Sequence, residues 1–338
     1  MNKTELIEKI KTLYPYYTRV NSMKKSELLQ LYNKNCANIP LVNNKNSCYM
    51  DSLFVALFIG DSDKKIFNLL TSTPTDNPIV ITIKQQLLKI YNIITGKVYR
   101  ETICSRLRHN INKFFIEYNR DKLNVEVVDW KHGQVDPTFL FECLEKIFNT
   151  PNMLREKIST YGSHTKKIAV KNLIVGNVDD HTTSCIHNIT SDNLIGKKTL
   201  LLKSIFPKRK EVAHLDKTNL YRLGGINVPT KVVQVNVLSS PLVYVNIDRV
   251  VYGMNKLTTE IIPFRKLKLI NNNLPIYLKS IIIHYGSKSG GHYVCAFECK
   301  NNWYLYDDLH DDIQNIGTFE DLLTHHNILK NTKAFIYY

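Results

Sequence analysis

The chain has 338 residues and a formal net charge of +15, and 43% of its residues are apolar. That length suits one large domain with a small appendage, and the apolar fraction argues against a disordered chain. The positive charge favours acidic partners or polyanions and indicates nothing about the fold.

The cysteines argue against a secreted protein stapled by disulfides. There are seven of them, and no two form a CxxC pair, whereas secreted disulfide scaffolds carry denser, even-numbered sets. The N-terminus is charged and amphipathic, unlike a signal peptide. No apolar run approaches the ~18 residues of a membrane-spanning helix. We therefore expect free thiols in a reducing compartment and no membrane contact.

Residues 1–34 are predicted to form a hairpin of two short helices. The first begins near Thr4, Pro15 ends it, and Ser22 can cap the second. Seven Lys and Arg stand against three Glu in this segment, a net charge of +4. The segment resembles the SAP-type helical hairpin, a small DNA-binding module. Two interpretations stay open: contact with DNA, or a solvated hairpin that packs on the main domain or binds a partner protein.

The rest of the chain divides into a helical part and a β-rich part. Apolar residues recur at helical spacing from 48 to about 160, most clearly in 48–58, around 83–96 and in 136–148. After about 165, short runs rich in Val, Ile and Tyr are bounded by Asn, Gly, Ser and Pro, which predicts a largely antiparallel sheet. The fold class is therefore α+β, and a cysteine from one part would meet a histidine from the other at their junction.

The first segment with candidate catalytic residues surrounds Cys48. Apolar residues follow Cys48 at i+2, i+5, i+6, i+9 and i+10, which predicts a buried helix that begins at or just after the cysteine. A cysteine at a helix N-terminus lies among unpaired N–H groups at the positive end of the macrodipole, and both effects favour the nucleophilic thiolate. Asn43, in the polar loop before Cys48, could supply an amide donor to an oxyanion. The alternative is a small buried cysteine without a catalytic role.

The second segment runs from a β-strand through a Gly/Ser loop to His292, and then to a strand that ends in Asp307 and Asp308. A histidine at one strand start and an aspartate on the neighbouring strand can pair, so that the aspartate fixes the tautomer and the other nitrogen can take a proton from a thiol. Gly290 and Gly291 leave little side chain beside such a site, which would suit a narrow channel for a slim substrate tail.

Together these segments resemble the Cys box and His box of the ubiquitin-specific protease family of deubiquitinases. The Cys box of that family is an Asn, four residues, then Cys-Tyr-Met-Asn-Ser, and this chain has Asn43 and then Cys-Tyr-Met-Asp-Ser at 48–52. The His box has His-x-Gly, Gly-Gly-His-Tyr and an aromatic strand ending in Asp-Asp, matched at 284–286, 290–293 and 303–308. The strand that ends in Arg249 is a further landmark, and the resemblance covers about 38–338.

The resemblance implies a papain-like cysteine protease fold with a helical lobe and a β lobe, and cleavage after the C-terminal glycine of ubiquitin. It makes Cys48 the nucleophile, His292 the general base and Asp307 the residue that orients it, with Asn43 in the oxyanion hole and Asp308 as an auxiliary. The expected substrate-binding residues are Gly290, Gly291, Tyr293, Gln134 and His284, of which His284 would shape the loop.

The chain departs from the family pattern in three places. Asp51 replaces an Asn and adds a negative charge that would oppose thiolate formation. The segment 134–138 lacks the usual acidic placement, which puts its ubiquitin contacts in doubt. The two CxxC pairs that bind zinc in the family are absent; His181, Cys185 and His187 could give three zinc ligands without an evident fourth, so we expect a metal-free β-extension and no cofactor.

Several alternatives stay open. The modifier could be SUMO or another ubiquitin-like protein, or the chain could be a catalytically weak ubiquitin-binding module or a DNA-tethered interaction factor. The excess of Asn, Ile, Lys and Tyr is typical of an AT-rich genome. With the compact size it suggests an enzyme of a large DNA virus, working as a monomer in the host cytoplasm, with the virion and the nucleus as other locations.

Overall fold

The computed structural model describes part of the chain. The described residues are 2–13, 20–28, 36, 41, 47–72, 75–95, 110, 135–148, 154–161, 185–205, 212–223, 226–237, 242–251, 255–267, 275–287, 290–310 and 313–338, with the backbone path alone for 154–161, 212–223 and 226–237.

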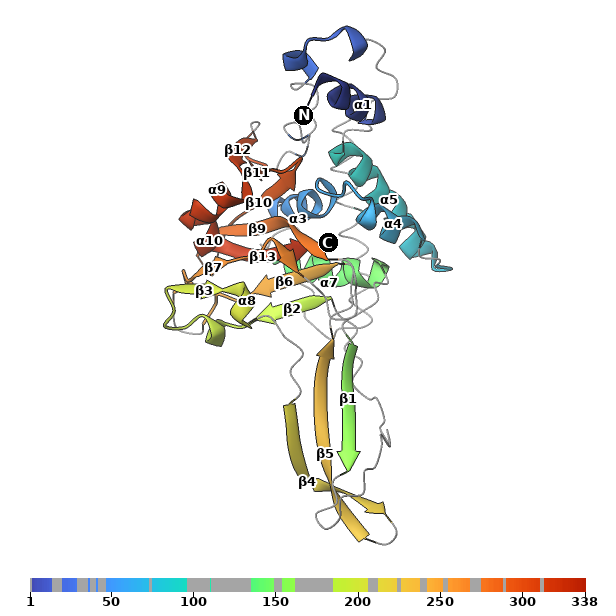
Figure 1. Cartoon of the computed structure of the whole chain (residues 1–338), viewed down its shortest axis with the longest axis vertical. Helices are drawn as coiled ribbons and strands as arrows, with labels where there is room; N and C mark the ends of the chain where they lie inside the picture. The colour runs from blue at the N-terminus through green and yellow to red at the C-terminus, as the bar shows by residue number, and fades with distance from the viewer. Residues whose placement is uncertain are drawn as a thin grey trace.

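An eight-stranded sheet forms the centre of the molecule, in the order β12-β11-β10-β9-β13-β6-β2, with β8 paired to β9 (Figure 1). Its strands are β2 (Ile186–Ile189), β6 (Val243–Ile247), β8 (Lys266–Leu267), β9 (Ile276–Gly286), β10 (Gly291–Cys299), β11 (Asn302–Tyr306), β12 (Gln314–Gly317) and β13 (Thr332–Tyr337). Neighbouring strands are antiparallel, except for the parallel pair β2 and β6.

Helices cover both faces of this sheet, and each face has its own apolar core. One face carries α3 (Cys48–Phe58), α4 (Lys65–Ser72), α5 (Pro78–Ile94) and α7 (Pro137–Phe148), and the other carries α9 (Phe319–Thr324) and α10 (His326–Asn331). The strands alternate between the two cores: Cys295 and Phe297 face the first, Val294 and Ala296 the second. This period of two is what a strand buried on both faces requires.

The helix α3 is buried along its whole length, from Cys48 to Phe58. It packs on β10 and β9, and two hydrogen bonds fix its C-terminal half: Ser280 Oγ donates to the Ala56 carbonyl (2.7 Å) and Tyr338 Oη to the Leu57 carbonyl (3.0 Å). The start of α3 is therefore held in a fixed position relative to the strand that contains His292.

The described residues form two smaller sheets in addition to the central one. The first is three-stranded, in the order β1-β5-β4, from β1 (Leu154–Tyr161), β4 (Val212–Leu223) and β5 (Ile226–Val237). The second pairs β3 (Thr199–Leu201) with β7 (Glu260–Ile262). The short helix α8 (Leu202–Ile205) directly follows β3 in the chain. A 3₁₀ turn, η2 (Ser191–Asn193), precedes β3.

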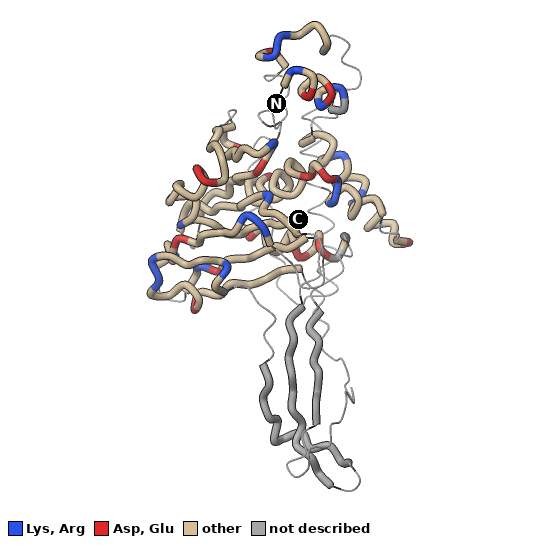
Figure 2. The backbone as a smooth tube through the Cα atoms, viewed as in Figure 1, with Lys and Arg blue, Asp and Glu red and all other residues tan. Residues whose placement is uncertain are grey.

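The N-terminal segment has a small apolar cluster of its own. The helix α1 (Lys3–Leu13) is followed by the turn η1 (Val20–Ser22), and Leu6, Ile10 and Leu28 are buried together. Lysines and glutamates both lie along α1 (Figure 2). The first predicted helix is thus confirmed; the predicted second helix is described only at its start, residues 25–28, and Pro15 lies outside the described residues.

The structure corrects two expectations. We expected thiols at Cys36 and Cys299, but the two form a disulfide, which joins the segment after the N-terminal helices to the end of β10. We expected β-structure only after about 165, but β1 begins at Leu154, and α9 and α10 interrupt the β-rich part. Among the described residues, no helix has the length and apolar character needed to span a membrane.

Candidate active site

Cys48 is the first residue of α3 and is 7% exposed. The carbonyl of Ser47, just before it, accepts hydrogen bonds from the backbone N–H groups of Met50 and Asp51, both at 2.9 Å. The first N–H groups of a helix have no acceptor within the helix and stand at the positive end of its dipole. The sulfur therefore lies where negative charge is stabilised, as a thiolate nucleophile needs.

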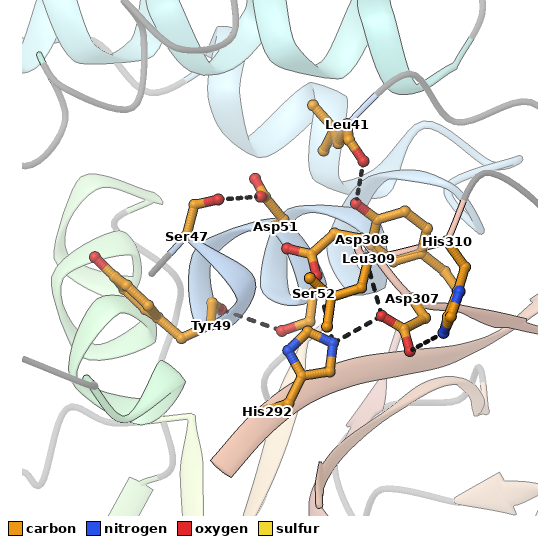
Figure 3. Close-up of polar contacts among 11 residues, drawn as sticks. Leu41, Ser47, Tyr49, Asp51, Ser52, His292, Asp307, Asp308, Leu309 and His310 are labelled. Carbon is orange, nitrogen blue, oxygen red and sulfur yellow. Dashed lines mark hydrogen bonds and ion pairs between the residues drawn. The ribbon is translucent and has the colours of Figure 1, made fainter. Parts of the chain in front are cut away.

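His292 and Asp307 come together at the ends of neighbouring strands (Figure 3). His292 is the second residue of β10, and Asp307 directly follows β11. The antiparallel register that pairs Cys295 with Tyr306 brings the two side chains side by side. His292 Nε2 lies 2.7 Å from Asp307 Oδ1, and the other ring nitrogen faces the first turn of α3 (Figure 3).

The pKa of His292 is raised to about 9. The largest cause is a hydrogen bond with the Cys48 side chain; burial opposes it, and the hydrogen bond and charge of Asp307 and the charge of Asp308 raise the pKa further. His292 is therefore within hydrogen-bonding reach of Cys48 and carries a proton at neutral pH. A protonated imidazole between a sulfur and a carboxylate is the arrangement of an activated Cys–His pair.

A tight turn holds the Asp307 carboxylate in place. Oδ1 also accepts a hydrogen bond from the Leu309 N–H (3.0 Å), and the Asp307 carbonyl accepts one from the His310 N–H (3.1 Å). Oδ2 lies 3.8 Å from His310 Nε2. Asp308 is 3% exposed, with Oδ1 3.4 Å from His292 Nε2. Asp307 is thus the closer carboxylate and Asp308 a second negative charge on the same nitrogen.

Asp51, the departure from the family's Cys box, is fully buried in the first turn of α3. Its Oδ2 accepts a hydrogen bond from Ser47 Oγ at 2.7 Å (Figure 3). A carboxylate in the first turn of a helix interacts favourably with the helix dipole. Both the dipole and the Ser47 hydrogen bond suit a carboxylate at this position, and the effect of Asp51 on the ionisation of the thiol stays a prediction.

The residues around the β9–β10 hairpin pack against one another. The imidazole of His284 stacks on Tyr293 with ring centroids 4.5 Å apart, and burial, followed by the charge of Lys256, lowers the pKa of His284 to about 4. A Cβ at Gly291 would collide with the His284 ring and the Tyr285 carbonyl. Gly291 is therefore required by this internal contact, and its place beside a substrate channel stays a prediction.

Some predicted site residues lie outside the described part of the chain: Asn43, Gln134 and His181. Of the other two residues weighed as zinc ligands, Cys185 is buried and its backbone N–H donates to the Glu145 carboxylate, and burial lowers the pKa of His187. Among described residues, the one cluster with the spacing of metal ligands is His292, Asp307 and Asp308, which is the acid–base group above.

Sequence reasoning missed three contacts that hold the site together. Lys333 of β13 pairs with Asp136 just before α7, Nζ to Oδ2 at 2.6 Å. Tyr306 Oη donates to the Leu41 carbonyl (2.7 Å), which fixes the chain a few residues before Cys48. Lys256 donates to the β9–β10 hairpin. Lys256 lies in an aperiodic loop, whereas Lys333 and Tyr306 lie in the strands β13 and β11, and in each case no sequence pattern indicates the distant partner.

Arg249, a landmark of the resemblance, has a structural role. It is 4% exposed and donates to four backbone carbonyls, those of Leu257, Thr259, Leu329 and Thr332, at 2.8–3.1 Å. Burial lowers its pKa to about 10. The guanidinium thus ties the end of β6 to the loop before β7 and to α10.

A cysteine at a helix start, a histidine on the adjoining sheet and a carboxylate behind it define a cysteine-dependent hydrolase of papain-like α+β fold. The sequence model of one family, described as ubiquitin carboxyl-terminal hydrolase, matches residues 39–337. Because this match spans most of the chain, the protein belongs to that family of cysteine-type deubiquitinating hydrolases.

Solved structures agree on the fold. The chain is similar to a chain of the SAGA Ubp8/Sgf11/Sus1/Sgf73 DUB module bound to ubiquitin aldehyde, with a TM-score of 0.57 and 13% identity over 98% of this chain and 75% of that one. It is also similar to a chain of the same module with a cysteine-to-alanine variant of Ubp8, bound to monoubiquitin, with a TM-score of 0.55 and 12% identity over 95% and 75% of the two chains. No curated protein matches the sequence.

Proposed function

We propose that this family member hydrolyses the isopeptide or peptide bond after the C-terminal glycine of ubiquitin, with Cys48 as nucleophile, His292 as acid and base and Asp307 as the residue that orients the imidazole. The observation that carries the proposal is the hydrogen-bonded series from Cys48 through His292 to Asp307. Ubiquitin as the substrate rests on the family and on the ubiquitin-bound state of the two similar structures.

The chemistry follows from this arrangement. The Cys48 thiolate attacks the carbonyl carbon of the terminal glycine, and the carbonyl oxygen becomes an oxyanion that the N–H groups at the start of α3 and the Asn43 amide stabilise. The intermediate collapses, the C–N bond breaks, and His292 gives its proton to the leaving amine. Water then attacks the thioester while His292 takes its proton, and the thiolate leaves. Asp307 holds the ring in the tautomer that both steps require.

A ubiquitin probe with a C-terminal electrophile tests the proposal. We expect covalent labelling of the wild type, loss of labelling in Cys48→Ala, and unchanged labelling in Cys143→Ala, which removes another buried cysteine that is not disulfide-bonded. Labelling by a SUMO probe alone would move the substrate to that modifier. Binding of ubiquitin without labelling would instead support the catalytically weak binding module, and labelling of Cys48→Ala would refute the assigned nucleophile.

We also propose, from the charge and helix spacing of residues 1–34, that the N-terminal hairpin contacts DNA. Of its described residues, Lys3, Lys9, Lys11, Lys24 and Lys25 stand against three glutamates. Binding through lysines to phosphates weakens steeply with salt. DNA retention that falls with salt and disappears on deletion of 1–34 would support this contact, whereas equal retention of the truncated chain would refute it and favour a partner protein or the main domain as the hairpin's ligand.

The origin and setting of the enzyme are further proposals from its composition. The excess of Asn, Ile, Lys and Tyr, together with the compact size, supports a virus-encoded enzyme, and a monomer in the host cytoplasm is proposed with it. Light scattering of the purified chain tests the monomer. Fractionation of host cells that express the gene distinguishes the cytoplasm from the nucleus and, in particles, from the virion.

A further inference from the structure

The strand β9 loses one of its two neighbours shortly before the active site. Its C-terminal part pairs with β10 up to the last residue, with His284, Tyr285 and Gly286 opposite Tyr293, His292 and Gly291. On its other side it pairs with β13, but β13 begins at Thr332, which stands opposite Ile283. Beyond Ile283 the backbone groups of β9 that face this side meet no further strand within the described part of the chain, and such groups need other partners.

Lys256 occupies this position. Its ammonium donates to the carbonyls of His284 and Gly286, the latter at 3.4 Å, and to Asn331 Oδ1 at 3.2 Å. Alternate residues of a strand direct their carbonyls to the same side, so one ammonium serves both. The residue between the two carbonyls is Tyr285, the cross-strand partner of His292.

The surroundings of Lys256 hold its ammonium in place. Asn331 Nδ2 donates to the carbonyl and the side-chain oxygen of Asn327, both at 2.9 Å, and this orients its Oδ1 toward Lys256. The Leu257 N–H donates to the Arg249 carbonyl at 2.9 Å, which closes the loop that carries Lys256. The contact therefore joins three elements: the loop between β6 and β7, the β9–β10 hairpin and the end of α10.

We propose that Lys256 is a positioning residue for catalysis, which fixes the unsupported end of β9 and thereby the placement of the His292 imidazole relative to Cys48. Lys256 acts through the hairpin, by its bonds to the carbonyls on either side of Tyr285. The inference rests on the proposed roles of Cys48 and His292.

The charge state of Lys256 adds a pH dependence. Burial, with the charges of Arg249 and Lys333, lowers the pKa of Lys256 to about 8. Below that pH the ammonium has three hydrogens for three acceptors; above it the neutral amine has two. Of the other groups that face it, Arg249 has a pKa of about 10 and His284 a pKa of about 4, so neither changes charge near pH 8. Turnover should therefore begin to fall at about pH 8, before His292, with its pKa of about 9, loses its proton.

The test compares Lys256→Met with Lys256→Arg. We expect Lys256→Met to lower kcat about tenfold with a smaller change in KM, because charge-assisted hydrogen bonds to a positioning group are lost. Lys256→Arg should restore most of kcat and move the alkaline fall in turnover to higher pH, because a guanidinium keeps its charge. Lys330→Met is the matched control, since Lys330 on the neighbouring α10 pairs with Glu260 at 3.4 Å and is 46% exposed.

Two results would overturn the inference. The first is a Lys256→Met variant with the kcat and the pH profile of the wild type. The second is a Lys256→Arg variant whose kcat falls as far as that of Lys256→Met and whose alkaline limb does not shift. Thermal unfolding of each variant separates a general loss of stability from a positional effect, because only the latter changes kcat at temperatures where the variant is folded. If the wild type is not labelled by the ubiquitin probe at Cys48, the proposed function fails; if it is labelled and Lys256→Met turns over normally, only this inference fails.

Discussion

Replacing Asp307 tests the proposed catalytic series most directly. Asp307→Ala removes the 2.7 Å contact to His292 Nε2 and leaves Asp308, at 3.4 Å, as the remaining carboxylate. A hydrogen bond to a charged group is typically worth about 1.5–3 kcal/mol. At 1.36 kcal/mol per factor of ten, kcat/KM should fall roughly 10- to 150-fold. Asp307→Asn keeps an acceptor oxygen without the charge, so its loss should be about tenfold.

The pH profile gives a second, independent measure of the same interaction. The pKa of His292 is raised to about 9, above the ordinary value of about 6.5, so the imidazolium is stabilised in the folded protein and this stabilisation is lost as pH rises through about 9. Because Asp307 contributes to the shift after Cys48, Asp307→Ala should move the part of the alkaline limb of kcat/KM that His292 sets, above the fall assigned to Lys256, about one pH unit lower.

The assay is the initial rate of release of a fluorophore from the ubiquitin C-terminus between about pH 5 and pH 10. Asp308→Asn should cost less than Asp307→Asn, and Asp192→Ala, a change at an exposed aspartate in η2, should have no effect. Equal losses for Asp307→Asn and Asp308→Asn, or an alkaline limb that does not move in Asp307→Ala, would refute the assignment of Asp307 as the orienting residue.

Three further substitutions test what supports the site. Gly291→Ala forces a methyl group against His284, and overpacking of this kind should lower the free energy of unfolding by about 1–3 kcal/mol and reduce turnover; wild-type turnover and an unchanged denaturation midpoint would contradict the contact. Arg249→Met leaves four backbone carbonyls without their donor, and denaturant unfolding should show a loss of about 3 kcal/mol; a loss below ~1 kcal/mol would mean that water replaces the donor. Cys36→Ser opens a disulfide between residues 263 positions apart, so the chain-entropy estimate predicts that the free energy of unfolding falls by about 5.6 kcal/mol. A reductant should destabilise the wild type and leave the variant unchanged, and identical midpoints would show that the bond contributes nothing.

Periodic segments of the sequence predict their structure well. The predicted helix 48–58 coincides with α3 because its apolar residues repeat at helical spacing and all of them are buried. The strands on either side of the Gly/Ser loop were predicted from runs of β-branched and aromatic residues, and they are present as β9 and β10. These segments carry Cys48 and His292, which is why two members of the proposed catalytic series can be placed from the sequence.

Contacts between distant, aperiodic positions could not be predicted in the same way. The bond between Cys36 and Cys299 depends on how Cys36 and the end of β10 meet in space, and no spacing rule relates their positions. Lys256 resembles any other lysine in a polar loop; its role depends on β13, which begins only at Thr332 and leaves the edge of β9 open beside Lys256. The requirement for Gly291 comes from the His284 ring on the paired strand. In each case the determining partner is set by tertiary packing.

The strand β11 connects two parts of the proposed reaction centre. Its last residue, Tyr306, donates to the Leu41 carbonyl and so holds the chain that leads into the loop before Cys48, and the next residue is Asp307, which orients His292. The helix α3 is fixed on the same sheet through Ser280 and Tyr338. The proposed nucleophile, the proposed acid–base group and the chain at Leu41 are therefore all fixed to one sheet. The small spacing that proton transfer between sulfur and imidazole demands is then maintained by the packing of α3 on β10, and this packing is the physical reason that a thiol from the helical part and an imidazole from the β-rich part can act as one group.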